Sequence, residues 1–314
     1  MSAATRPHRR ILALLFATLL LAWLAPALLS PWALSQLTFV ALYVIAGSGL
    51  MLLAGHAGQL SLCHAAFLGI GAYAEAWLQQ QGWPLAASLP AAALLAAAGG
   101  ALAALPARRL AGIYLAISTF AFGFIVQEIF ARWESVTGGN SGLVVAPLAA
   151  AHLFWLALAL AAGALWLLGR LRQSRFGRAL LAWREDPAAA AVTGIATARL
   201  QGVAFALSAA LAGLAGALYA HQLRFISPEQ FDWVMSIELL MMLVIGGLGR
   251  RAGIVLGAGF LIALPQAIAL LRDTLDWQAP PAGIELFVFG AVLIVTLRIF
   301  PAGLAGWFGR SASL

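Results

Sequence analysis

The sequence predicts an all-α, polytopic helical membrane protein with about ten transmembrane helices, each about 20 residues long. Of its 314 residues, 63% are hydrophobic, and the mean hydropathy is +0.95. A soluble domain is only about half apolar. Apolar runs recur along the whole chain, and the few charged residues lie mostly between them. The short alternating segments of an outer-membrane barrel do not occur.

The apolar runs define ten candidate spans within a single transmembrane domain, residues 1–314, although eight to ten are compatible with the pattern. Their ends are defined only to within a few residues, because boundaries are the least certain part of such a prediction. The spans are Ile11–Leu29, Ser35–Ala54, Gln59–Gln80, Ala86–Leu105, Leu110–Glu128, Ala150–Leu168, Leu200–Ala220, Trp233–Leu248, Ala252–Leu271 and Gly283–Leu297.

The arginines set the orientation, because basic residues concentrate in cytoplasmic loops. All 18 basic residues are Arg. With the N-terminus in the cytoplasm, only Arg132, Arg224 and Arg272 fall outside, and the other fifteen fall inside. We therefore expect both termini in the cytoplasm.

The first span has a second interpretation. Three Arg, a short apolar run and Ala25-Pro26-Ala27 also fit a cleavable signal peptide. Its removal would leave nine spans, so the sequence leaves open whether this span is retained.

Residues 169–199 form one long polar interruption on the Arg-rich side, with six Arg and two acids. Asp186 is suited to cap a helix start, and Pro187 is tolerated at the first helical position. The alanines that follow end at Gly194, a residue type that commonly stops a helix. The pattern predicts a short cytoplasmic helix presented to a soluble partner.

Several function classes are excluded by composition. Without any Lys the chain has neither a P-loop lysine nor a Schiff-base lysine, so we expect an ATP site only in a partner. The single Cys63 excludes an intrachain disulfide and a multi-Cys metal site. The Arg residues are not interleaved with aromatics as in a nucleic-acid surface. We expect no catalytic residue, metal or cofactor in this chain.

A very short linker, Gly55-His56-Ala57-Gly58, joins the second and third spans. Irregular backbone at membrane depth is tolerated only where it is buried in protein or lines a water-filled cavity. Gln59, Ser61 and His64 follow this linker and either line a polar pathway or hydrogen-bond to neighbouring helices. Glu75 is the deepest acid, and its contact with His64 would require the helices to bring them together.

Five segments resemble permease subunits of branched-chain amino acid ATP-binding cassette (ABC) importers, of the LivM rather than the LivH type. In order they are GQLSLCHAAFLGIGAYA, TGGNSGL, GRALLAWREDPAAAAVTGI, AFALSAALAGLAGALYA and IGGLGRRAGIVLGA. The resemblance covers roughly Tyr43–Leu297, with the segments in order at sensible spacing, and a series of motifs in order is far more specific than any one alone.

The resemblance implies that residues 169–199 are the cytoplasmic coupling loop that docks on an ATPase subunit. Pro187 and Trp183 depart from the family pattern, which usually has an acidic and an aliphatic residue there. Neither change disturbs the capped helix. The residues expected to carry the coupling role are Arg184, Glu185, Asp186, Ala189, Ala190 and Gly194.

The resemblance also implies partners and a location. A second homologous permease, two ABC ATPase subunits that bind ATP, and an extracytoplasmic binding protein would assemble with this chain in the bacterial inner membrane. Related permeases carry urea or short amides, so those substrates remain open beside branched-chain amino acids. Together with the short linker, the resemblance places Gln59, Ser61, His64 and Thr119 near the translocation pathway.

Two other classes compete with this interpretation. An ion-coupled secondary transporter of a small amphipathic solute predicts several deep acids, and the sequence offers only Glu75. A membrane enzyme needs a nucleophile beside a base, and the sequence shows no such cluster.

Overall fold

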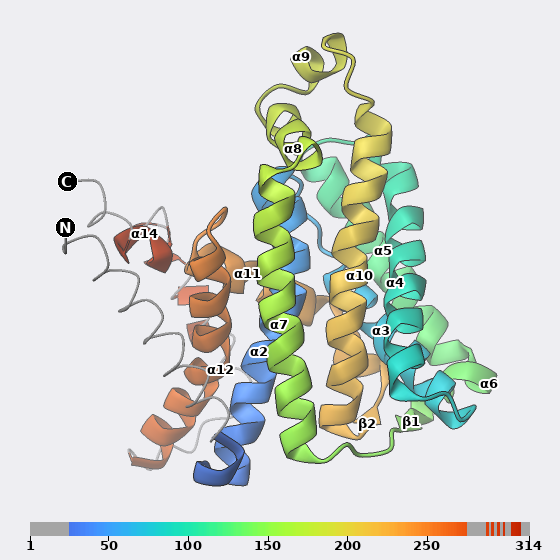
Figure 1. The fold of residues 1–314 in the computed structure, drawn as a ribbon, viewed down its shortest axis with the longest axis vertical. Coiled ribbons are helices and arrows are strands. Elements are labelled where there is room, and N and C mark those ends of the chain that lie inside the picture. The colour runs from blue at the N-terminus through green and yellow to red at the C-terminus, as the bar shows by residue number, and fades with distance from the viewer. Residues whose placement is uncertain are drawn as a thin grey trace, which may run out of the picture.

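A computed structural model of the chain describes residues 25–274, and then 287–288, 290–291, 294–295, 298 and 303–308. Within these residues six helices are long and apolar enough to cross a membrane, and they run roughly side by side (Figure 1). The described part of the chain is therefore an all-α bundle of a multi-pass membrane protein. The six helices are Pro31–His56 (α2 with its continuation η1), α4 (Leu85–Ala107), α5 (Ile113–Arg132), α7 (Ala150–Gln173), α10 (Thr197–Leu223) and Arg251–Leu271 of α12 (Arg251–Thr274).

Two shorter helices, α3 (His64–Gln80) and α11 (Trp233–Gly246), complete the match to eight of the predicted spans. The third span begins later than predicted, at His64 instead of Gln59, because residues 57–63 are not helical. The predicted spans Ile11–Leu29 and Gly283–Leu297 lie outside the described residues, apart from a few positions.

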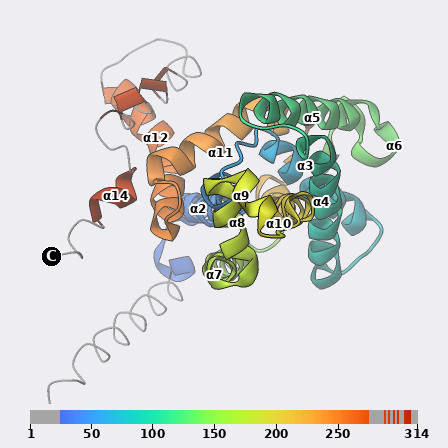
Figure 2. The ribbon, with the colours of Figure 1, turned by 90° about the horizontal axis from the view of Figure 1, so that it is seen from above.

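The central helix of the bundle is α10, which packs against α2, α3, α4 and α7 (Figure 2). Small residues allow the backbones to approach closely. A Cβ added at Gly71 on α3 would lie 2.0 Å from the carbonyl oxygen of Gly213 on α10, and one at Gly216 would lie 1.9 Å from that of Leu68. Any larger residue at Gly71 or Gly216 would force the two helices apart, which explains the glycines in these apolar runs.

The span that begins with α2 does not end as an α-helix. It continues as a π-helix, η1 (Met51–His56), and then as irregular backbone that stays mostly buried through Cys63. Gly58 has a φ of +67°, a conformation that favours glycine. The break predicted from the short linker is confirmed, and it lies inside the protein.

The bundle has two different ends, shown at the top and bottom of Figure 1. The loop end carries α8 (Arg175–Glu185) and α9 (Pro187–Val192) between α7 and α10. Because α7 runs to Gln173 and α10 starts at Thr197, the connecting segment is residues 174–196, shorter than the predicted 169–199. The sequence indicated one short helix here, and α8 is a second.

The strand end carries an antiparallel pair that the sequence did not reveal, with Leu143 opposite Ile226. Gly138, Gly139 and Gly142 all have positive φ, so the turns predicted for TGGNSGL are confirmed. The other small elements are α6 (Glu134–Thr137), η2 (Gly139–Ser141), β1 (Leu143–Val144), β2 (Phe225–Ile226), η3 (Pro228–Phe231) and α14 (Leu304–Phe308).

The two ends give a direct test of orientation. Val192 on α9 is 89% exposed and Val144 on β1 is 72% exposed, whereas the native Cys63 is fully buried and should give little background. In sealed cells we expect an impermeant maleimide to label Val144→Cys but not Val192→Cys, and to label both after permeabilisation. Labelling of Val192→Cys from outside would reverse the predicted orientation.

Candidate functional site

The break between α2 and α3 leaves backbone N–H and C=O groups that are not paired within a regular helix. Thr119 on α5 accepts a hydrogen bond from the backbone N–H of Leu62 at 3.0 Å and donates its own proton to the carbonyl of Ala116. Ser236 on α11 accepts from the N–H of Ala65 at 3.0 Å. An unpaired amide at this depth would be costly, so side chains from other helices hold the break in place.

His64 stands at the first position of α3 and joins two further helices. The Ser208 hydroxyl donates to the carbonyl of Gly49 on α2 at 2.6 Å, so its oxygen accepts from His64 Nε2 at 2.9 Å. His64 Nδ1 is then left to accept from the Ser61 hydroxyl at 3.2 Å. This arrangement fixes a neutral imidazole with both nitrogens satisfied, and it links the break to α2 and α10.

Gln59 lies on the opposite side of the break, toward the loop end. Its side-chain oxygen accepts from Gln201 Nε2 at 3.2 Å, and the same nitrogen donates to the carbonyl of Ala107 at 3.0 Å. Gln59 also lines a cavity of about 450 Å³ together with Arg108, Arg109 and Arg184.

The four predicted pathway residues are thus brought together around the break. Each of them is buried and has a hydrogen-bond partner, and Gln59 also faces a cavity. Ser61, His64 and Thr119 make the contacts to neighbouring helices and backbone that the sequence left as the alternative. Their role in a pathway stays a prediction.

The start of α9 is capped as the sequence predicts. The Asp186 carboxylate accepts from the backbone N–H groups of Ala188 at 2.8 Å and Ala189 at 3.0 Å, and Pro187 occupies the first turn. Asp186 has extended backbone, as expected for a capping residue.

The end of α9 has two hydrogen bonds of the kind that close a helix before a left-handed glycine. The N–H of Ile195 donates to the carbonyl of Ala190, and that of Gly194 to the carbonyl of Ala191, both at 3.1 Å. Gly194 has a φ of +84° and nothing within 4 Å of the place where a Cβ would sit. Its backbone conformation, not space, is therefore the reason for glycine here.

Arg184, at the end of α8, contacts the break directly. Its guanidinium donates to the carbonyl of Gly55 at 2.5 Å, and a Cβ added at Gly58 would lie 2.7 Å from Arg184 Cγ. Glu185 beside it is exposed. The sequence predicted a coupling role for Arg184. It did not predict this contact with Gly55, because the two residues are 129 positions apart in the chain.

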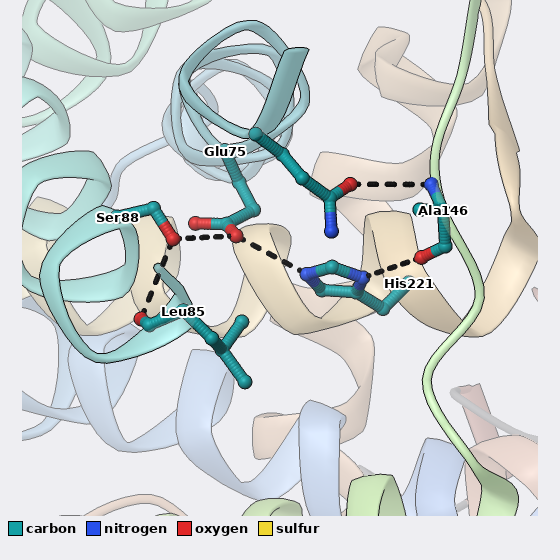
Figure 3. Close-up of polar contacts among 6 residues, drawn as sticks. Glu75, Leu85, Ser88, Ala146 and His221 are labelled. Atoms are coloured by element: carbon teal, nitrogen blue, oxygen red, sulfur yellow. Dashed lines mark hydrogen bonds and ion pairs between the residues drawn. The ribbon is translucent and has the colours of Figure 1, made fainter. Parts of the chain in front are cut away.

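A second buried polar cluster lies nearer the strand end, and Figure 3 shows it. Glu75 Oε1 accepts from the Ser88 hydroxyl at 2.8 Å and lies 3.2 Å from His221 Nε2. The other ring nitrogen of His221 lies 3.0 Å from the carbonyl of Ala146, to which it can only donate.

The 3.2 Å between Glu75 Oε1 and His221 Nε2 is a hydrogen-bond distance. Both side chains are fully buried. Glu75 has this partner in place of His64, which contacts Ser61 and Ser208 instead. His221 gave no signal in the sequence, because one His near a span end is not distinctive.

The geometry and the comparisons point to the same class of protein. The family model for the permease component of branched-chain amino acid transport systems matches residues 32–297. LivM, the high-affinity branched-chain amino acid transport system permease protein of Escherichia coli strain K12, is 31% identical over 323 aligned residues, covering 92% of this chain and 74% of LivM. LivM of Salmonella typhimurium gives the same values.

A more distant likeness covers part of the chain. The autoinducer 2 import system permease protein LsrC of Escherichia coli O9:H4 is 33% identical over 151 residues, which is 46% of this chain and 42% of LsrC. No solved structure matches significantly.

The family match defines the class of protein, a membrane permease, and the multi-pass helical bundle agrees with it. The chain belongs to the permease component family of branched-chain amino acid transport systems.

Thr119→Val tests the role of the break's hydrogen bonds. Valine has nearly the same shape but leaves the N–H of Leu62 without its acceptor, so unfolding should become easier by about 1–3 kcal/mol. Thr119→Ser keeps the hydroxyl and is the matched control. Unfolding is followed by the reaction of buried Cys63 with a fluorogenic maleimide. Equal stability of the Val and Ser variants would contradict the proposed role.

Proposed function

We propose that this chain is the membrane-spanning permease subunit of an ABC importer in the bacterial inner membrane. It would form part of the translocation pathway for branched-chain, hydrophobic amino acids delivered by an extracytoplasmic binding protein. The observation that carries this proposal is α9, a capped helix standing outside the end of the bundle in a chain of this permease family (Figure 1).

The surface of α9 suits a close contact with another protein. Ala188 and Ala189 are exposed and small, and Val192 is 89% exposed. Small side chains let a helix seat deeply in a groove, and an exposed valine at the tip provides apolar area to bury there. We propose that the occupant is an ABC ATPase subunit, which binds the ATP, and that this chain itself holds no cofactor.

The assembly would hold two such ATPase subunits and a second, homologous permease. Residues 1–314 would act as one transmembrane domain, with the connecting segment 174–196 as its coupling loop.

The contact of Arg184 suggests how movement of α9 reaches the pathway. A helix displaced by an ATPase would carry Arg184 with it and act on Gly55 and Gly58. There the backbone is not held by a regular α-helical ladder, so it can move without unwinding a whole helix. Ser61 and His64 follow directly and link this segment to α10.

The substrate proposal rests on the names of the LivM relatives and on the chemistry of the break. Groups that line a pathway must not hold a zwitterion so strongly that release becomes slow. The side chains near the break, Gln59, Ser61, His64 and Thr119, are neutral polar groups among apolar helices, which suits that requirement.

Substitutions in α9 test the coupling role. In reconstituted complexes, Gly194→Val should lower uptake per ATP hydrolysed several-fold, because a β-branched residue disfavours positive φ and the helix end would unfold or shift. Gly194→Asn, which tolerates this conformation, is the matched control and should retain more coupling. Ala189→Arg should also uncouple, because its bulk enters the contact.

All three variants should still insert and assemble, since α9 lies outside the bundle. Normal uptake per ATP in both Gly194→Val and Ala189→Arg would exclude α9 as the coupling helix.

The Glu75–His221 pair is the one observation that favours the ion-coupled alternative, because a buried pair of titratable groups is a candidate relay. The pair and its two partners, Ser88 and Ala146, come from four segments and fit a structural role equally. We expect Glu75→Gln to lower the yield of assembled complex while uptake per assembled complex stays within about twofold of wild type, because Gln keeps a carbonyl oxygen to accept from Ser88.

The measurement is uptake normalised to assembled complex. A Glu75→Gln complex that assembles normally and transports nothing would move Glu75 into the energetic mechanism and favour ion coupling.

A further inference from the structure

A second cavity lies at the loop end, among η1, the end of α7, α8 and the start of α12. Its volume is about 270 Å³. Two arginines from different helices line it, Arg172 from α7 and Arg251 from α12, with the Gln173 side chain beside them. No acidic residue is among the described residues that line it.

The two arginines have no partner of their own in the described part of the chain, where neither makes a hydrogen bond or an ion pair with another described residue. The adjacent Arg250 differs, since it donates to the carbonyl of Ala305. The Arg251 guanidinium lies over Gly169, where an added Cβ would come within 2.5 Å of it. Glycine at this position of α7 leaves room for the charge beside the cavity.

His56 supplies a third, independent observation. It lines the same cavity, is 4% exposed, and its Nδ1 is buried without a hydrogen-bond partner among the described residues. A buried ring nitrogen without a partner destabilises the folded chain.

The start of α12 adds to the positive potential. The chain turns sharply at Gly249, which has a φ of +84° and lines the cavity, and the 24-residue helix begins at Arg251. The N-terminal end of a helix carries a partial positive charge and favours an anion.

We propose that this cavity, which His56 also lines, binds an oxyanion of the phosphate class held by Arg172 and Arg251. Guanidinium groups match phosphate oxygens in pairs of hydrogen bonds, which makes arginine well suited to this ligand. The phosphate is either the headgroup of an anionic phospholipid, since the site lies at the end of membrane spans, or free inorganic phosphate. Leu181 of α8 also lines the cavity, so a bound phosphate would connect α7 and α12 next to the segment that carries α9.

The test measures binding to the full-length chain in detergent and needs neither ATPase subunits nor transport. Thermal unfolding is followed by the reaction of buried Cys63 with a fluorogenic maleimide. Two probes are titrated, inorganic phosphate against chloride at equal ionic strength, and phosphatidylglycerol against diacylglycerol with the same acyl chains. Wild type is compared with Arg172→Gln and Arg251→Gln. Arg175→Gln, which removes one charge from the same end but lies outside the cavity lining, is the matched control.

We expect a saturable rise of the unfolding midpoint in wild type and Arg175→Gln, with apparent affinity about tenfold or more weaker in Arg172→Gln and Arg251→Gln. A rise with both probes, or with inorganic phosphate alone, supports free phosphate. A rise with phosphatidylglycerol alone supports the lipid headgroup. A response that is absent, or equal in wild type, Arg172→Gln, Arg251→Gln and the control, would overturn the site, because phosphate also stabilises proteins without binding specifically. Because the readout is binding, failure of the ABC assignment would leave this result unaffected.

Discussion

The connection between α2 and α3 interrupts a helix inside an apolar bundle, and the need to satisfy its backbone governs the arrangement around it. Three hydroxyl groups from three different helices hydrogen-bond to this connection or to the His64 ring that begins α3. They belong to Thr119, Ser208 and Ser236. The π-helical turn of η1 precedes the break. The helices therefore pack where they do partly because the break requires partners at these positions.

The connection has backbone hydrogen bonds at its start, from Ala57 to Leu52 and from Gln59 to Leu53, and depends on side chains beyond them. Such a segment differs mechanically from a continuous helix. The hydrogen bonds from side chains are few and come from separate elements, so they can be exchanged one at a time. Arg184 adds a hydrogen bond from the loop end. A soluble partner acting on α9 would displace this hydrogen bond. The same end carries a cavity with two arginines that have no partner among the described residues, so the region beneath α9 combines a mechanical contact with a charged site. Under the proposed function, the energy of ATP hydrolysis would enter the permease at this end.

The sequence predicted the fold class, the positions of eight helices, six of them long enough to cross a membrane, the break and both caps of α9, because each of these depends on local chemistry. Hydropathy indicates which segments are buried in lipid, and Gly55–Gly58 is too short for an ordinary loop. Asp186 and Gly194 cap α9 through contacts with residues only a few positions away. Contacts between distant segments were not predictable in this way. Neither the Glu75–His221 pair nor the hydrogen bond of Arg184 to Gly55 has a local signature. The β1–β2 pair was missed because two-residue strands leave no periodicity.

The central claim is that this permease takes its energy from ATP bound by partner subunits and not from an ion gradient. The most direct measurement is leucine uptake into proteoliposomes that contain the purified assembly and the binding protein. ATP is enclosed, and a protonophore and a sodium ionophore are present. The account predicts uptake that requires enclosed ATP and persists when both ionophores remove the gradients. Uptake that proceeds without ATP and collapses with either ionophore would contradict it.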